Sequence, residues 1–196
     1  MALGACDQIR NLIHRYSEAV DQGRFEVLDE LFADATVRMA MGPGAPGPGL
    51  DGRSVGAMFG DGIILYADGT PRTRHLVTNM IIEVDEEAAR ATARSYNTTL
   101  QQVPGRGIEI IATARYEDSF RLVDGTWRFS ERIIRHTSLD GVHRDFIGDM
   151  SRHTRSAPLP AYLLTCLACL AWRGRRRGPG HCGPEVKTPG SVRAAG

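Results

Sequence analysis

Apolar residues near the N-terminus repeat with the spacing of α-helices. Between Asp7 and about Gln22 they share one helical face, which Asp7 can cap and Gly23 can end. That face consists of Ile9, Leu12, Ile13, Tyr16, Ala19 and Val20. A second, shorter helix is predicted over 25–33, with an apolar side made of Phe25, Leu28, Leu31 and Phe32.

The next segment alternates between regular and irregular patterns. "ATVRMAM" (35–41) reads as a strand, whereas "GPGAPGPGLDG" (42–52) is too rich in Gly and Pro for regular structure and predicts a loop. Ser54 can cap a third helix that runs to about Tyr66, although Gly60 and Gly62 weaken it.

From residue 73 the apolar period changes to two, which is typical of strands. Strands are predicted at about 73–85, 90–103, 108–123 and 126–137, with turns at 85–87 and at Asp124-Gly125. Helices followed by a long meander predict an α+β fold, with helices packed on one face of a curved antiparallel sheet.

The alternation also predicts which side chains share a face of each strand. Around His75 the predicted face-mates are Val77, Asn79 and Ile81, and in the last strand they are Trp127, Phe129 and Ile133. In the strand 108–123 one face is predicted to hold Ile110, Ala112, Ala114, Tyr116, Phe120 and Leu122.

Charge divides the chain into two parts. Residues 1–150 carry 16 arginines and 22 acidic residues, whereas 151–196 carry eight basic residues and one acidic residue. The acidic body argues against nucleic-acid binding as the main function. We therefore expect one domain over 1–155 and an atypical basic tail over 156–196, largely disordered apart from a short apolar patch.

The positions of the cysteines and the N-terminal sequence indicate in which cellular compartment the protein is expected. Three of the four cysteines, Cys166, Cys169 and Cys182, lie in the tail, so only Cys6 belongs to the body, which therefore cannot form an internal disulfide. The N-terminus lacks the pattern of a signal peptide, and no apolar run is long enough to span a membrane. A reducing, cytoplasmic setting is expected.

Common chemical motifs are not found in the body. The six histidines do not show metal-binding spacing, and His136, which lies near Asp140 and His143 in the sequence, reads as a solvated polar residue. The Gly-rich loop has prolines where a phosphate site needs N–H donors. No G-x-S-x-G motif occurs there either.

Tyr16, Asp21 and His75 remain as candidates for catalysis. Asp21 falls in the last turn of the first helix, where the helix dipole disfavours a carboxylate unless a cation or imidazole offsets it. His75 lies at the start of a strand among apolar residues, so its ring nitrogens need partners. From these residues alone, His75 is either a buried structural histidine or a general base oriented by a carboxylate.

Three segments resemble a known family. "IRNLIHRYSEAVDQGRFEVLDELFADAT", "PRTRHLVTNMIIEVDEEAARATARSY" and "ARYEDSFRLVDGTWRFSERII" are similar, in order, to the SnoaL-like branch of the NTF2-like superfamily. The resemblance implies a cone in which a curved sheet wraps against helices around an apolar pocket. Members nearest in pattern are cofactor-free lyases with a His–Asp dyad, of the scytalone dehydratase, bile-acid dehydratase and hexachlorocyclohexane dehydrochlorinase type.

Carried over to this chain, the resemblance implies a dyad of His75 and Asp21, with Tyr16 binding a substrate oxygen. It implies a hydrophobic cyclic substrate, steroid-like or polyketide-like, no cofactor, no metal, and a homo-oligomer, either a dimer or a trimer. Isomerases, polyketide cyclases and non-catalytic oxygenase small subunits share the superfamily and stay open as alternatives. Candidate substrate-binding residues are Phe32, Met58, Phe59, Asn97, Tyr116, Trp127 and Phe129.

Overall fold

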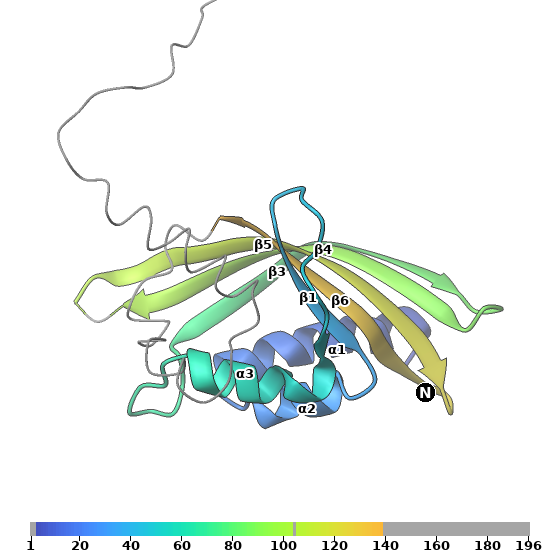
Figure 1. Cartoon of the computed structure of the whole chain (residues 1–196), viewed down its shortest axis with the longest axis horizontal. Helices are drawn as coiled ribbons and strands as arrows, with labels where there is room; N and C mark the ends of the chain where they lie inside the picture. Colours follow the sequence, from blue (N-terminus) through green and yellow to red (C-terminus); the bar gives the residue numbers. More distant parts are fainter. Residues whose placement is uncertain (1–2, 104, 139–196) are drawn as a thin grey trace, which may run out of the picture.

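Helices pack against one face of a single curved sheet (Figure 1). The computed structural model of the chain describes residues 3–103 and 105–138. The whole of the predicted basic tail, 156–196, and the end of the predicted domain, 139–155, therefore lie outside the described residues. The α+β class is confirmed.

The N-terminal elements follow the predicted order with shifted ends. The helices are α1 (Ala5–Asp21), α2 (Glu26–Leu31) and α3 (Val55–Gly62), the last preceded by the 3-10 turn η1 (Gly52–Ser54). The residue that caps α1 is Gly4, not Asp7 as predicted. Asp7 lies inside the first turn, where its negative charge interacts favourably with the helix dipole. The helix α3 ends at Gly62 rather than Tyr66, which fits the weakness that its glycines introduce.

Six strands form the sheet in the order β2-β1-β6-β5-β4-β3. The strands are β1 (Thr36–Met41), β2 (Leu50–Asp51), β3 (Thr73–Asp85), β4 (Arg90–Val103), β5 (Gly107–Val123) and β6 (Thr126–Ser138). The last four form the predicted antiparallel meander, and β1 pairs with β6 in parallel. The short strand β2 lies inside the predicted loop.

A bulge in β3 changes which residues share the face of His75. Thr78 pairs with Tyr96 and Ile81 with Arg94, so Asn79 and Met80 both oppose Ser95. Asn79 has a positive φ of 51°, a conformation that asparagine tolerates better than most residues. Beyond the bulge, the odd-numbered positions turn outward, and Ile81 is 53% exposed. The prediction that Asn79 and Ile81 lie on the face of His75 was therefore wrong.

Two further bulges change the faces of β5 and β6. One, next to Thr99, turns Ile110 outward, where it is 60% exposed. Another, around Ser119 and Phe120, places Arg132 and Ile134 on the inner face in place of Ile133. A bulge inserts one residue and so inverts the alternation after it, which a strict period of two cannot anticipate.

The core lies between α1, α2 and the inner, helix-facing side of the sheet. Phe32 on the helical side meets Phe129 at 4.8 Å between ring centroids, and Phe129 meets Phe120 at 4.7 Å. Trp127 is buried in the same cluster at the start of β6. This aromatic layer fixes the helices against the sheet and so sets the position of the end of α1.

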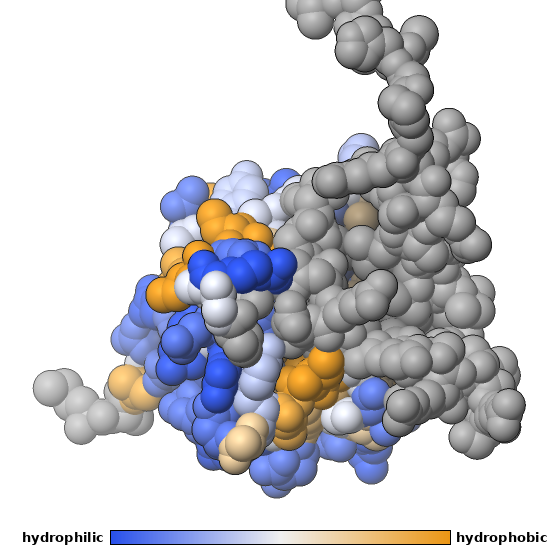
Figure 2. Space-filling view, turned by 90° about the vertical axis from the view of Figure 1, so that its left-hand side faces the viewer, coloured by the Kyte–Doolittle hydropathy of each residue, from blue (hydrophilic) through white to orange (hydrophobic). Residues whose placement is uncertain are grey.

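The outer face of the sheet, which points away from the helices, carries exposed apolar side chains. Leu76, Ile81 and Tyr96 are each about half exposed there. The surface seen in Figure 2 is mostly hydrophilic, with separate apolar patches. In the described part of the chain, no helix has the length and apolar character needed to cross a membrane.

Candidate functional site

Asp21, the last residue of α1, contacts the start of β3 through three short interactions. His75 Nδ1 lies 2.6 Å from Asp21 Oδ1, and the Thr73 hydroxyl donates to the same oxygen at 2.7 Å. The backbone N–H of His75 donates to Oδ2 at 2.9 Å. Both side chains are largely buried, with 8% of His75 and 11% of Asp21 exposed. The helix end and the strand are thus joined at a buried carboxylate–imidazole pair.

The local sequence explains why these groups meet. Thr73 and His75 are two residues apart on β3, so both side chains point to the inner face. After Asp21 the chain must reverse, and Gly23 adopts a positive φ of 69° against the loop that leads into β3. A Cβ at Gly23 would lie 2.4 Å from the carbonyl oxygen of Gly69, so only glycine allows this close approach.

Electrostatics keep Asp21 ionised. Burial by itself would raise its pKa, but the hydrogen bond and charge of His75, together with the His75 N–H and the Thr73 hydroxyl, bring the pKa of Asp21 below its ordinary value. A carboxylate beside Nδ1 favours the tautomer that carries its proton there. Nε2 is then the nitrogen with a lone pair, which is the arrangement of a general base.

Tyr16 lies one turn and a half before Asp21 on α1 and contacts the same imidazole. Its ring centroid is 6.3 Å from that of His75, edge to face. Burial raises the pKa of Tyr16 to about 12, although the charge of Arg132 and a hydrogen bond from Tyr116 oppose the increase. Tyr16 is therefore a neutral phenol at physiological pH and can donate a hydrogen bond.

A buried ion pair that the sequence analysis missed lies beneath the two tyrosines. Arg132 Nε and Nη2 donate to the two carboxylate oxygens of Asp118 at 2.7 and 2.8 Å, and neither side chain is exposed. Burial would lower the pKa of Arg132, but the attraction and hydrogen bonds of Asp118 raise it. The guanidinium is therefore a permanent positive charge inside the fold.

Aromatic rings surround this guanidinium. Its central carbon lies 4.4 Å from the ring centroid of Tyr16 and 4.5 Å from that of Tyr116, with Phe129 and Phe32 slightly farther away. The signal that could have found the pair is Asp118, which interrupts the apolar alternation between Tyr116 and Phe120 on the inner face.

Most of the predicted substrate-binding residues are buried. Phe32 and Phe59 contact the ring of Tyr16 at centroid distances of 5.8 and 6.4 Å, and Tyr116 at 5.9 Å. Met58 precedes Phe59 on α3 and is half-buried, and Asn97 is buried on the inner face of β4. Trp127 and Phe129 belong to the same buried cluster as Phe32 and Tyr116, where Phe129 contacts Phe32 and Phe120.

His136 departs from its predicted environment. The expectation of a solvated residue was wrong, because the side chain is half-buried and its Nδ1 is shielded from solvent, and burial lowers its pKa to about 4. The inversion of faces along β6 places His136 on the inner side, in line with Arg132 and Ile134. Its sequence neighbours Asp140 and His143 lie outside the described residues. Within 3–103 and 105–138, no three His, Cys, Asp or Glu side chains are grouped so as to hold a metal ion.

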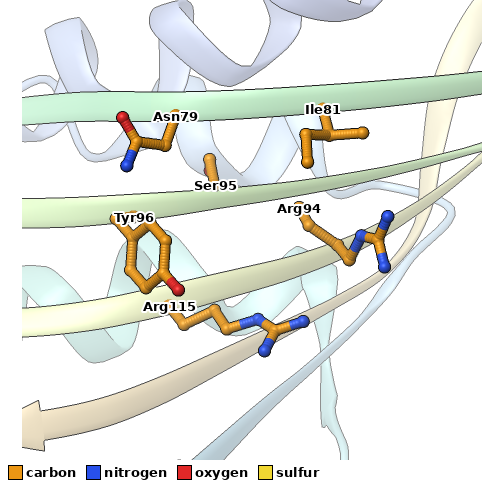
Figure 3. A pocket seen from close by; sticks show the side chains of 6 residues that line it. All are labelled: Asn79, Ile81, Arg94, Ser95, Tyr96 and Arg115. Atoms are coloured by element: carbon orange, nitrogen blue, oxygen red, sulfur yellow. The ribbon is translucent and has the colours of Figure 1, made fainter.

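A concavity of about 200 Å³ lies on the outer face of the sheet, beside the β3 bulge (Figure 3). Asn79, Ile81, Arg94, Ser95, Tyr96 and Arg115 line it. Arg94 is paired with Glu83 at 3.6 Å and Arg115 with Glu117 at 3.5 Å, so their charges are already partly balanced. This concavity is on the opposite side of the sheet from His75 and does not extend the inner site.

Comparison with known families identifies the domain. Residues 1–133 match the model of the SnoaL-like domain, which is about two thirds of the chain. The chain belongs to the SnoaL-like family. The predicted resemblance is thereby confirmed, and the matched region of this SnoaL-like protein contains Tyr16, Asp21, His75 and Arg132. No curated protein matches the chain.

Solved structures share the fold. One, a proposed scytalone dehydratase from Novosphingobium aromaticivorans, is 26% identical over 70% of this chain and 87% of its own, with a TM-score of 0.52. An NTF2-like protein with a cystatin-like fold from the same organism is 25% identical over 71% and 84%, with a TM-score of 0.51. The β subunit of a proposed aromatic-ring-hydroxylating dioxygenase from that organism, 20% identical over 68% and 89%, has a TM-score of 0.55 and shares the fold alone.

Proposed function

We propose that this SnoaL-like protein is a cofactor-independent lyase, of the dehydratase type, that acts on a hydrophobic cyclic substrate. The observation that carries the proposal is the 2.6 Å contact between His75 Nδ1 and Asp21 Oδ1, buried next to the phenol of Tyr16. A base, a group that orients it and an oxygen-binding donor are the minimum for removing a proton next to a carbonyl. The similarity to a proposed scytalone dehydratase supports the same reading.

In the proposed reaction, His75 Nε2 takes a proton from the carbon next to the substrate carbonyl. The electron pair of the broken C–H bond forms a carbon–carbon double bond, and the hydroxyl on the neighbouring carbon leaves as water with the proton that the His75 imidazolium gives back. Asp21 holds the imidazole and stabilises the imidazolium. General base catalysis of this kind contributes about 10²–10⁴-fold.

Tyr16 is proposed to donate a hydrogen bond to the carbonyl oxygen as negative charge develops there. The Tyr116 hydroxyl donates to the oxygen of Tyr16, which strengthens the donor that Tyr16 presents in turn. The buried positive charge of Arg132 lies under both rings and favours any negative charge that forms beside them. Arg132 thus acts through the tyrosines as a positioning residue.

The test is turnover by His75→Ala and Asp21→Asn on hydrophobic cyclic β-hydroxyketones, with product mass as the readout. We expect His75→Ala to lose at least about 10²-fold in kcat, because the base is removed. Asp21→Asn should lose turnover as well, because the tautomer is no longer fixed. His14→Ala, which changes an exposed histidine of α1, is the matched control and should retain activity. Near wild-type turnover in either dyad variant would contradict the proposal.

An isomerase or polyketide cyclase could use the same base and the same phenol. The observation that keeps this alternative is that His75, Asp21 and Tyr16 supply proton abstraction and oxygen binding without determining what leaves. Product mass separates the reactions, because loss of water lowers the mass by one water molecule and isomerisation leaves it unchanged.

We also propose that the chain forms a homo-oligomer, a dimer or trimer, through the outer face of the sheet. Leu76, Ile81 and Tyr96 are exposed there, side by side on the adjacent strands β3 and β4. Arg94 and Glu83 on the same face have opposite charges, so two copies of the face can complement each other.

A further inference from the structure

Several buried polar atoms on the inner face of the sheet have no partner among the described residues, and they belong to Ser95, Asn97, Arg132 and His136. Asn97 is 4% exposed, and its Nδ2 donates to the Thr99 hydroxyl at 2.9 Å, which leaves its Oδ1 unsatisfied. His136 Nδ1 is likewise shielded from solvent and lacks a partner there. Buried polar groups in folded proteins are nearly always hydrogen-bonded, so each of these atoms calls for water or a ligand.

The strand register places Asn97 and His136 on either side of one small residue. Asn97 on β4 pairs with Ala114 on β5, and Ala114 pairs with His136 on β6. Adjacent strands lie about 4.8 Å apart, so the backbones of Asn97 and His136 are separated by on the order of 10 Å. Ala114 is buried and its side chain is a single methyl group, so little of the protein stands between the two polar side chains.

Asn97 lies next to the proposed reaction centre, and His136 lies two strands farther across the sheet. His75 and Asn97 are on neighbouring strands, two residues apart in register, since His75 pairs with Thr99 and Val77 pairs with Asn97. Ser95, whose buried Oγ is also unpartnered among the described residues, occupies the next inward position of β4 toward Tyr116. The unsatisfied atoms therefore follow the inner face away from the His75–Asp21 pair.

The chemistry of the two atoms restricts the group that can satisfy both. Asn97 Oδ1 is only an acceptor, so its partner must donate. His136 is neutral at physiological pH because burial lowers its pKa to about 4, and its Nδ1 either donates or accepts according to tautomer. A hydroxyl donates and accepts at once. A ketone, an ether or an ionised carboxylate has no proton to donate to Asn97.

We propose that Asn97 and His136 form a hydroxyl-binding subsite for a second oxygen of the substrate, with Asn97 one strand and His136 three strands away from His75. The inference rests on the proposed function in that it assigns a substrate class to the same inner site. The substrate is then a fused cyclic compound that carries a hydroxyl group far from the carbon that loses its proton. Asn97 and His136 select and orient it, whereas His75 acts on it.

The experiment measures binding without turnover, by calorimetry or by quenching of tryptophan fluorescence. The probes are 2-naphthol, 2,6- and 2,7-dihydroxynaphthalene, and their monomethyl ethers 6-methoxy- and 7-methoxy-2-naphthol. We expect one dihydroxy isomer to bind about tenfold more tightly than 2-naphthol and than its own methyl ether, which corresponds to about 1.4 kcal/mol. The ethers keep the second oxygen but replace its proton with a methyl group, and 2-naphthol lacks this oxygen without adding bulk.

Variants locate the preference. In Asn97→Leu and His136→Leu the advantage of the diol over its ether should fall to within about twofold, while 2-naphthol still binds. Thr98→Val, which changes the outward neighbour of Asn97 on β4, is the control and should retain the advantage. Circular dichroism and urea denaturation establish that each variant is folded. Should Asn97→Leu not fold, Asn97→Asp provides a second test, because a charged acceptor should strengthen the preference for the diol.

The results separate this inference from the proposed reaction. If neither diol binds better than its ether, or if the advantage persists in both leucine variants, the subsite is refuted and the unsatisfied atoms bind only water. Because no chemistry is needed, the preference should persist in His75→Ala. If the wild type turns over substrate through His75 but does not prefer a diol to its ether, only the subsite is refuted. If the wild type prefers the diol but its turnover does not depend on His75, only the lyase proposal is refuted.

Discussion

The buried Arg132–Asp118 pair is a residue-scale feature on which stability depends strongly. Both groups are fully buried, and two short hydrogen bonds join them. Removing one partner leaves an uncompensated charge in the interior, which costs about 3–5 kcal/mol. Replacing both with apolar side chains of similar volume is far less harmful, because no charge is then left unpaired.

Asp118→Ala should therefore lower the free energy of unfolding by about 3–5 kcal/mol in urea denaturation. The double variant Asp118→Leu with Arg132→Met should recover most of this loss. Glu131→Ala, which breaks the half-exposed ion pair with Arg38, is the control and should cost at most about 1 kcal/mol. An equal effect of Asp118→Ala and Glu131→Ala would contradict the account of the buried pair.

His136 makes stability depend on pH in a defined window. Its pKa is about 4 in the folded protein and about 6.5 in an unfolded chain, so the unfolded state binds the proton more readily. The contribution of neutral His136 to the free energy of unfolding is fully present above about pH 6.5. It is lost as the pH falls toward 4, which lowers the free energy of unfolding by roughly 3 kcal/mol. Asp21, whose pKa is lowered, contributes above its ordinary pKa and loses its contribution only at still lower pH.

Urea denaturation between pH 4 and 7 tests this expectation. The wild type should lose stability on acidification across that range, and His136→Gln should lose markedly less. His14→Gln, at an exposed histidine, should follow the wild type. Parallel pH profiles for the wild type and His136→Gln would show that His136 is not the group responsible.

At the scale of elements, the turn after α1 determines where Asp21 points. Gly23→Ala should destabilise the fold by more than about 1 kcal/mol, because the residue has a positive φ and the new methyl group would collide with the Gly69 carbonyl. Gly62→Ala, at the end of α3 with open space around it, is the matched control and should be neutral or slightly stabilising. Thermal denaturation measures both, and equal effects would contradict the assigned role of Gly23.

The sequence predicted the elements well and their faces only in part. The ends of β3 and β4 were correct because Gly-poor strands with clear alternation end at turn residues. The faces of Ile81, Ile110 and Ile133 were wrong because a bulge separates each from the residues that were predicted to share its face. A bulge depends on the neighbouring strand rather than on local pattern. The parallel pairing of β1 with β6 also joins segments that no local pattern relates.

The same distinction applies to the candidate site. Tyr16, Asp21 and His75 were selected from a helix end and a strand start, and the structure brings them together. Arg132 and Asp118 were missed because a charged residue in a strand normally faces water, and its burial is visible only when both partners are placed. His136 was misjudged because its face depends on the bulge in β6.

At the scale of the whole molecule, the apolar outer face bears on association. We expect light scattering at micromolar concentration to give the mass of a dimer or trimer. Ile81→Lys, which places a charge at a half-exposed apolar position of that face, should lower the mass toward that of a monomer. Leu65→Lys, at an exposed apolar residue outside the sheet, is the control. A monomeric wild type would refute self-association.

The pairing of β1 with β6 has a consequence for how the chain folds as it is synthesised. Arg38 on β1 precedes its ion-pair partner Glu131 on β6 by 93 residues, so β1 has no neighbour on that side until the last strand leaves the ribosome. At about 5–20 residues per second, this wait lasts on the order of 5–20 s. During it, the apolar strand is an unprotected edge on which two nascent chains could pair. A chain that stops short of β6 would leave that edge open permanently, which makes early termination an aggregation hazard as well as a loss of activity.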